Sequence, residues 1–208
     1  MKKVIFALMA IAMFGTFTGC KCTNEKADET NTESAEIVLD SLISADRQYM
    51  LLNYGSDYKL HKSCVQLDNF LDADTTVTVY SVSNIFQTVE NTDEASFGTK
   101  AFSIAHGSEN NGNEVKELTF WVLDEPLNEE DVKITLTQAI EMVRAANYPK
   151  PHSRHVVLQK EAGSNPNTNA QYVFGNSQAQ LYVDAVTGEV TDKNPAFKGF
   201  GLTTKKRK

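Results

Sequence analysis

The fold class is indicated most clearly by the sequence QLYVDAVTGEV, residues 180–190. Its side chains alternate, so that Leu181 and Val183 point to the opposite face from Asp184, as in a β-strand with one buried side. In the turn that follows, Gly188 can adopt a positive φ without steric cost, and Asp184 can accept hydrogen bonds from the turn amides. The stretch therefore predicts a closing β-hairpin whose polar residues serve the turn and form no site.

A well-marked amphipathic helix precedes this hairpin in the sequence ITLTQAIEMVRAA, residues 134–146. Thr135 and Gln138 have the spacing of a capping box, and the proline-containing NYPKP (147–151) ends the helix. The expected apolar face consists of Leu136, Ala139, Ile140, Val143 and Ala146. The strand patterns that follow are HVVLQK (155–160), AQYVF (170–174), AQLYVDAV (179–186) and EVTD (189–192).

The first half of the chain shows the same order of elements. The spacing predicts a helix from Ala35 to Asn53, capped by Ser34 and followed by Gly55. Its expected apolar face consists of Val38, Leu42, Ala45, Tyr49 and Leu52. The expected strands are SCVQL (63–67), TTVTVYSVSNIFQTVE (75–90), KAFSIAH (100–106) and VKELTFWVL (115–123), with GSENNGNE (107–114) as a hairpin loop.

Two helix-and-strands patterns in succession predict an α+β fold, in which helices cover one face of an antiparallel sheet. We expect one unit over residues 35–124 and a second over residues 125–198, followed by a basic, solvated tail over 199–208. Asn-Tyr ends both helices, at residues 53–54 and 147–148. A match this short leaves both an internal duplication and two unrelated halves open.

The closing hairpin, with its Asp-Ala and Thr-Gly-Glu-Val, resembles the end of PepSY and PepSY-like domains, and residues 134–146 resemble their helix. The resemblance covers residues 131–192, and the chain departs from it in the insertion KEAGSNPNTNAQ (160–171). A unit of this kind used twice would also resemble the tandem architecture of β-lactamase-inhibitor proteins. The resemblance implies a binding or inhibitory module, with protease regulation as one version, and it carries over no catalytic residues.

The amino terminus has the features of an export signal. Lys2 and Lys3 precede an apolar run over residues 4–17, which is shorter than the roughly 20 residues of a membrane span. The sequence FTGC, residues 17–20, resembles the lipobox of bacterial lipoproteins, in the looser form found in the Bacteroides group. The resemblance implies a signal peptide over residues 1–19 and a diacylglycerol on Cys20.

The stretch KCTNEKADETNTES, residues 21–34, contains no large apolar side chain and reads as a flexible tether. With Cys20 it gives a lipidated tether over residues 20–34, which would anchor the domain in the cell envelope. We then expect the lipid-anchored protein at the outer membrane or in the periplasmic leaflet. Whether it is exposed at the cell surface stays open. The net charge of −7 argues against nucleic acid as a partner, because such proteins need a basic face.

Motifs of catalysis and cofactor binding are not found in the sequence. It contains no HExxH, GxSxG or phosphate-binding glycine loop. His152 and His155 could form a metal pair only on a helix, but they lie between prolines and a strand. Asp68, Asp72 and Asp74 read as a solvated acidic turn, whereas Cys64 is either a buried thiol or the disulfide partner of Cys22. We therefore expect no enzyme, no metal and no cofactor.

The expected function is a non-catalytic binding module that holds a protein or peptide partner on its open sheet face or hairpin loops. The alternative is an accessory lipoprotein that binds a small molecule or a glycan on an aromatic patch. Trp121, the one tryptophan of the chain, is the candidate binding residue for this patch, because exposed aromatic rings dominate interface energetics.

Overall fold

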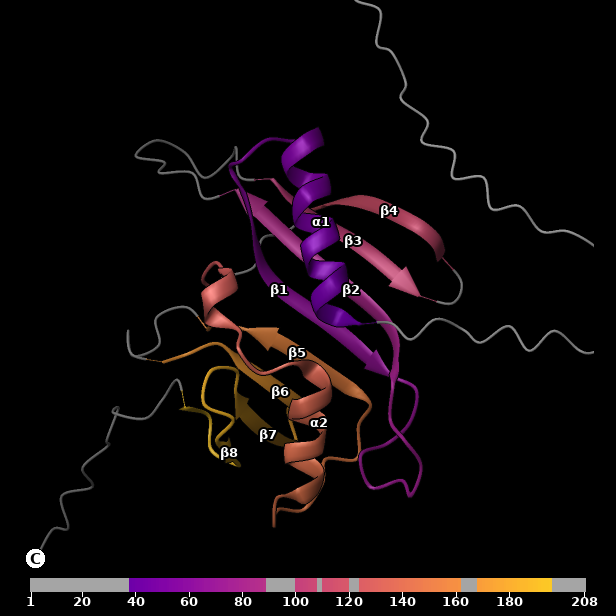
Figure 1. Cartoon of the computed structure of the whole chain (residues 1–208), viewed down its shortest axis with the longest axis vertical. Coiled ribbons are helices and arrows are strands. Elements are labelled where there is room, and N and C mark those ends of the chain that lie inside the picture. Colours follow the sequence, from indigo (N-terminus) through magenta and orange to yellow (C-terminus); the bar gives the residue numbers. More distant parts are fainter. Residues whose placement is uncertain (1–37, 89–99, 108–109, 120–123, 162–167, 196–208) are drawn as a thin grey trace, which may run out of the picture. The chain divides into compact units, whose positions relative to one another are not determined.

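The computed structural model describes residues 38–88, 100–107, 110–119, 124–161 and 168–195, and Ala35–Lys208 form one compact unit. Within the described ranges the chain forms two α-helices, a short 3-10 helix and one antiparallel sheet of eight strands (Figure 1). The elements are α1 (Leu39–Asn53), β1 (Tyr58–Leu67), β2 (Val79–Thr88), β3 (Ala101–Gly107), β4 (Asn110–Leu118), η1 (Glu129–Asp131), α2 (Leu136–Ala145), β5 (His155–Gln159), β6 (Gln171–Asn176), β7 (Ala179–Asp184) and β8 (Val190–Thr191). The expected α+β class is confirmed.

Both helices cover the same face of the sheet, as predicted, with α1 over the strands of the first half and α2 over those of the second (Figure 1). The register explains this, because one set of alternating side chains is buried under the helices all the way across the sheet. In the middle of the sheet, Val65 of β1 pairs with Val82 of β2 and Val156 of β5, and all three are buried. We call this side the helix-covered face and the other side the helix-free face.

The strand order is β4-β3-β2-β1-β5-β6-β7-β8, so the two halves meet where β1 pairs with β5. Each half contributes a helix and then four strands, and each half's strands lie in sequence order outward from this seam. One buried apolar cluster includes side chains from both halves, among them Phe86 and Phe174. The units expected over 35–124 and 125–198 therefore share one sheet and one core.

Helix α1 begins later than predicted and buries a different face. Its N-cap is Val38, which makes no side-chain cap, so the predicted cap by Ser34 is wrong. The buried residues are Leu39, Ile43, Asp46 and Met50. In the predicted stripe Leu52 is 75% exposed, because the whole pattern lies one residue out of phase with the face that meets the sheet.

Helix α2 forms as the sequence predicts. Thr135 Oγ1 accepts a hydrogen bond from the Gln138 amide at 3.2 Å, and Gln138 Oε1 accepts one from the Thr135 amide at 2.9 Å. Four of the five expected apolar positions are buried, and Ala146 is the C-cap. Near the end of the helix, the Arg144 guanidinium donates to the carbonyls of Ala73 and Thr75, which fixes the β1–β2 loop against α2.

The closing hairpin is confirmed in detail. Asp184 Oδ1 accepts hydrogen bonds from the amides of Val186 at 2.9 Å and Thr187 at 2.8 Å, and Gly188 has a φ of +77°. A Cβ at Gly188 would lie 3.0 Å from the Met142 side chain of α2, so the turn and the helix are closely packed. Glycine is thus required here by both the backbone conformation and the contact.

The hairpin between β3 and β4 differs from the prediction. Strand β4 begins at Asn110, where it pairs with Gly107, so most of the expected loop GSENNGNE belongs to a strand. β4 is an edge strand of the sheet, and polar or charged residues in an edge strand oppose pairing of its free backbone edge with other chains. None of the helices in the described part of the chain is long and apolar enough to cross a membrane.

Candidate functional site

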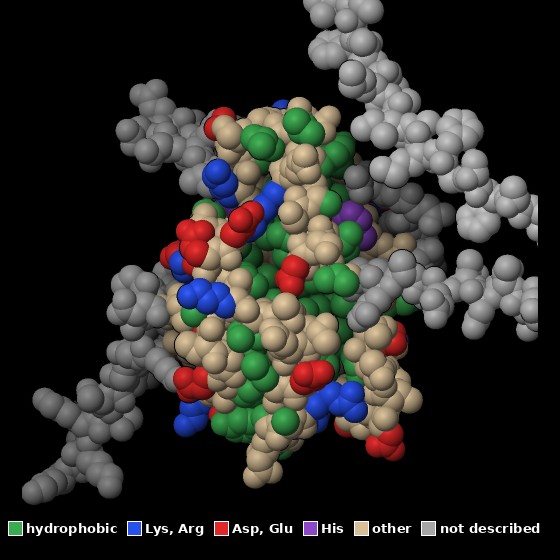
Figure 2. Space-filling model, viewed as in Figure 1, with side chains coloured by type: hydrophobic (Ala, Val, Ile, Leu, Met, Phe, Trp, Pro, Cys, Tyr) green, Lys and Arg blue, Asp and Glu red, His purple; other side chains and the backbone are tan. Residues whose placement is uncertain are grey.

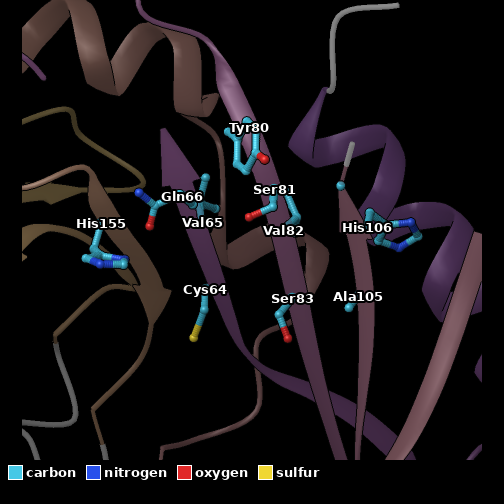
Figure 3. Close-up of a pocket in the computed structure, with 11 residues that line it drawn as sticks. Cys64, Val65, Gln66, Tyr80, Ser81, Val82, Ser83, Ala105, His106 and His155 are labelled. Carbon is cyan, nitrogen blue, oxygen red and sulfur yellow. The ribbon is translucent and has the colours of Figure 1, made fainter. Parts of the chain in front are cut away.

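The helix-free face carries a groove over β1, β2 and β3 (Figure 3). Its floor is set by the register of these strands, which aligns small side chains in rows. Cys64, Ser83 and Ala105 are cross-strand partners in one row. Gln66, Ser81 and Gly107 are partners in the next row. Larger side chains at these positions would fill the hollow.

The groove has a volume of about 580 Å³ and is open to solvent. The residues that line it are Cys64, Val65, Gln66, Tyr80, Ser81, Val82, Ser83, Ala105, His106, Gly107 and His155. No carboxylate, lysine or arginine is among these lining residues, although the chain as a whole carries a net charge of −7. The groove therefore differs from the rest of the charged surface in being neutral, with hydroxyl, amide and imidazole groups as its polar functions.

Two irregularities shape the groove. A register shift between Gln66 and Leu67 leaves Tyr80 as the extra residue of β2, and the Tyr80 side chain is 46% exposed beside the serines. Bulges of this kind redirect a side chain that regular pairing would place elsewhere. At Gly107, a Cβ would lie 3.0 Å from the Ser81 Cβ, so the absence of a side chain keeps β2 and β3 close here.

The polar groups of the floor are partly engaged with one another. Ser83 and Ser103 share a hydrogen bond of 2.7 Å between their hydroxyls, which orients both side chains on the helix-free face. His155 is exposed and lies beyond Gln66 in Figure 3, at the β5 side of the groove. A hydroxyl retains acceptor capacity after donating, so the floor can still bind donors of a ligand.

Cys64 is a weak candidate for a nucleophile. It is a free, partly buried thiol, and burial raises its pKa; Lys62 opposes this shift and Asp124 adds to it. A raised pKa lowers the thiolate fraction at neutral pH, and the thiolate is the reactive form. We interpret Cys64 as a small side chain of the floor.

A second cluster of polar side chains is buried between α1 and the sheet. His106 Nε2 lies 2.9 Å from both carboxylate oxygens of Asp46, and Asn84 donates to Asp46 Oδ2 at 2.8 Å. Ser63 Oγ in turn donates to Asn84 Oδ1 at 2.7 Å. Asp46 is only 1% exposed, and Ser63 and Asn84 are fully buried.

This cluster contains Ser, His and Asp but does not have the geometry of a catalytic triad. In a triad the histidine bonds to the serine, whereas here Ser63 donates to Asn84 and His106 bonds to the carboxylate. In Figure 3, His106 points toward a helix and away from the serines of the groove. The cluster therefore fixes α1 on the sheet, and the solvated groove has no general base positioned by it.

The histidines and acids singled out in the sequence lie apart. His152 stacks on Phe70, with ring centroids 4.2 Å apart, whereas His155 borders the groove. Asp68 accepts hydrogen bonds from the amide and hydroxyl of Thr78, which closes the β1–β2 loop. Across the described ranges, no three His, Cys, Asp or Glu side chains gather closely enough to hold a metal ion.

Several predicted residues lie outside the described part of the chain. They are Cys20, the proposed lipidation site, Cys22 and Trp121. The residues that sequence reasoning missed are the small ones of the groove floor, such as Ser83 and Ala105. The local sequence around them does not indicate a groove, because these residues form one surface only when the three strands pair.

No protein-family model, curated protein or solved structure matches this chain.

Proposed function

We propose that this chain is a non-catalytic binding module whose groove on the helix-free face receives an uncharged, extended segment of a partner protein. The observation that carries the proposal is the neutral groove of about 580 Å³, floored by small side chains. Small floor residues let a peptide backbone approach closely. The hydroxyl and amide groups can then pair with its N–H and C=O groups, which must be satisfied when they leave water.

The order of elements supports a module of tandem units. A helix followed by four strands occurs twice, and the two sets of strands extend outward from the β1–β5 seam. We propose that both halves are PepSY-like units, with the second ending in the hairpin of residues 180–190. Asp184, Gly188 and the capping box of α2 are the residues that support this resemblance. A binding or inhibitory role is what such a resemblance implies.

We also propose that the module is held in the cell envelope by a lipid on Cys20. The support is the sequence alone: an apolar run over residues 4–17, Gly19 before the cysteine, and a polar tether over 21–34. Two acyl chains suffice for a stable anchor, at about 0.8 kcal/mol for each buried methylene group. Removal of residues 1–19 would change the net charge from −7 to −9, so anionic lipids would not attract the module.

A second candidate ligand is a glycan. The observation that favours it is Tyr80, an exposed ring placed by a bulge beside Ser81 and the amide of Gln66. An exposed aromatic ring offers an apolar face for a sugar ring, and neighbouring hydroxyl and amide groups can bind sugar hydroxyls. Trp121, which the sequence offers for this role, lies outside the described residues.

The role of the groove in binding is tested by a substitution that fills it with a large side chain. We expect Ala105→Trp to abolish capture of the partner from envelope extract by the immobilised chain, as measured by quantitative mass spectrometry. Lys116→Trp is the matched control, because Lys116 pairs with Ser103 on the same face but lies outside the groove. An identical set of captured proteins for all three chains would refute the groove as the binding site.

Ala105→Trp together with Tyr80→Ala separates the two ligand classes. Binding of the wild-type chain to a glycan array, lost in Tyr80→Ala and in Ala105→Trp, would favour the glycan over the peptide.

The lipid anchor is tested separately by metabolic labelling with a fatty acid. We expect label on the wild-type chain and none on Cys20→Ser, and an unlabelled wild-type chain would refute lipidation.

A further inference from the structure

A second hollow lies on the helix-covered face, between α1 and the segment that leads from β4 to α2. It has a volume of about 250 Å³ and is distinct from the groove, which lies on the opposite face. Its walls come from Asp40, Ile43, Ser44 and Arg47 of α1 and from Leu127 and Val132 of the connecting segment. Figure 2 shows this face, with hydrophobic side chains at the bottom of the hollow and charged ones along its edges.

The floor of this cleft and the wall at Leu127 are apolar. Leu60 of β1, Leu158 of β5 and Leu127 are each at most 2% exposed. The connecting segment is held in place by backbone hydrogen bonds, one of which joins the Leu127 amide to the Leu60 carbonyl at 2.7 Å. A preformed apolar hollow with a few polar groups at its edge is the usual form of a small-molecule site.

The one cationic side chain that lines the cleft is already engaged. The Arg47 guanidinium donates to the Leu127 carbonyl at 2.8 Å and forms an ion pair with Glu129 at 3.4 Å. These contacts direct the positive charge of Arg47 toward the connecting segment.

Two carboxylates line the cleft; Glu129 is paired with Arg47, whereas Asp40 forms no ion pair within the described ranges. Burial raises the pKa of this carboxyl. The nearby Tyr172 hydroxyl donates its hydrogen bond to the Ile134 carbonyl at 2.9 Å and therefore does not donate to Asp40. Within the described ranges no hydrogen bond or ion pair involves the Asp40 side chain. A bound ammonium group would supply the opposite charge that this carboxylate lacks.

We propose that this cleft binds a small organic amine, with the ammonium group on Asp40 and the apolar body over Ile43 and Val132. Charge complementarity selects the head group, and the volume of the hollow limits the body to about the size of one ring. This site is independent of the groove on the helix-free face, so either can fail without the other.

Calorimetry on the full chain tests the site with phenethylammonium as the probe and phenethyl alcohol as its uncharged analogue. We expect the amine to bind at least about 10-fold more tightly, since one charge-assisted contact is commonly worth a factor of this order. Phenylpropanoate, the anionic analogue, should not bind. Equal affinities for amine and alcohol, or no measurable binding of the amine, would overturn the proposal.

Two variants identify the residues responsible. Asp40→Asn should reduce the affinity for the amine to that for the alcohol, and Ser44→Trp, at an exposed position on the cleft wall, should abolish binding of both. Glu141→Gln makes the same change in net charge at an exposed position of α2, away from the cleft, and should leave the affinity unchanged. Wild-type affinity in Asp40→Asn would contradict the assignment of the ammonium group to this carboxylate.

Discussion

Among single residues, Asp46 stabilises the fold from a buried position that its local sequence does not predict. An acidic residue on a helix normally faces water, because burying a charge without partners is costly. Here the charge is buried and receives hydrogen bonds from Asn84 and His106, which come from β2 and β3. The carboxylate thus ties α1 to two strands.

We expect Asp46→Ala to lower the free energy of unfolding by about 3 kcal/mol, since it leaves the buried Asn84 and the partly buried His106 without their acceptor. Urea denaturation followed by circular dichroism measures the change. Gln48→Ala, at an exposed position of the same helix, is the control and should change stability by less than about 0.5 kcal/mol. A loss from Asp46→Ala as small as that of the control would show that the buried cluster does not hold α1.

Asp184, in the closing turn, makes a pH-dependent contribution to the stability of the folded state. Burial alone would raise the pKa of this carboxyl, but hydrogen bonds from Thr187, Val186 and Asn169 outweigh it, and the pKa is lowered. A lowered folded-state pKa means that the stabilisation is present above the unfolded-state value of about 4 and is lost as the pH falls through the lower folded-state value.

Asp184→Ala should therefore cost about 1 kcal/mol at neutral pH, a modest value because solvent screens this partly exposed group. The difference between wild type and variant should shrink below about pH 4. Chemical denaturation at a series of pH values measures this trend. A difference that stays constant down to about pH 2 would mean that the carboxylate charge contributes nothing at the turn.

At the scale of elements, the capping box of α2 gives the helix its defined start. We expect Thr135→Ala to lower the free energy of unfolding by about 1 kcal/mol, because it removes the acceptor for the Gln138 amide. Thr137→Ala, two residues on and exposed, is the matched control and should have little effect on thermal stability. Equal losses in the two variants would assign the effect to helix propensity instead of capping.

Elements with strong local signals were predicted correctly from the sequence. Helix α2, the strands β5 to β7 and the closing hairpin all combine periodicity with turn or cap chemistry. Helix α1 was predicted in place but with the wrong buried face. The predicted apolar stripe of α1 lies at the edge of the surface that packs on the sheet, and the residues that face the sheet include Asp46. Periodicity counts apolar side chains and cannot anticipate a charged residue satisfied by distant strands.

The candidate groove was foreseen only in general terms. An open sheet face was expected from the fold class, but its location over β1 to β3 depends on the alignment of Cys64, Ser83 and Ala105. Strand register is set by pairings between residues far apart in the chain, and a shift of one residue would turn these side chains to the other face. The exposure of Tyr80 depends on a bulge, which the local sequence does not indicate.

At the scale of the whole molecule, the two halves of the described domain should unfold together. They share one sheet through the β1–β5 pairing and one apolar cluster. We expect a single thermal transition in which the near- and far-ultraviolet circular dichroism signals coincide. Two separated transitions would instead indicate that residues 35–124 and 125–198 are independent domains.

We propose that the module holds its partner on the helix-free face, over β1 to β3. Site-specific photo-crosslinking in intact cells tests it most directly, with the photoreactive residue placed at 105 in the groove, at 116 on the same face outside it, or at 48 on the exposed side of α1. We expect a discrete crosslinked product from position 105 and none from positions 116 and 48. A product from position 48 with none from position 105 would contradict it.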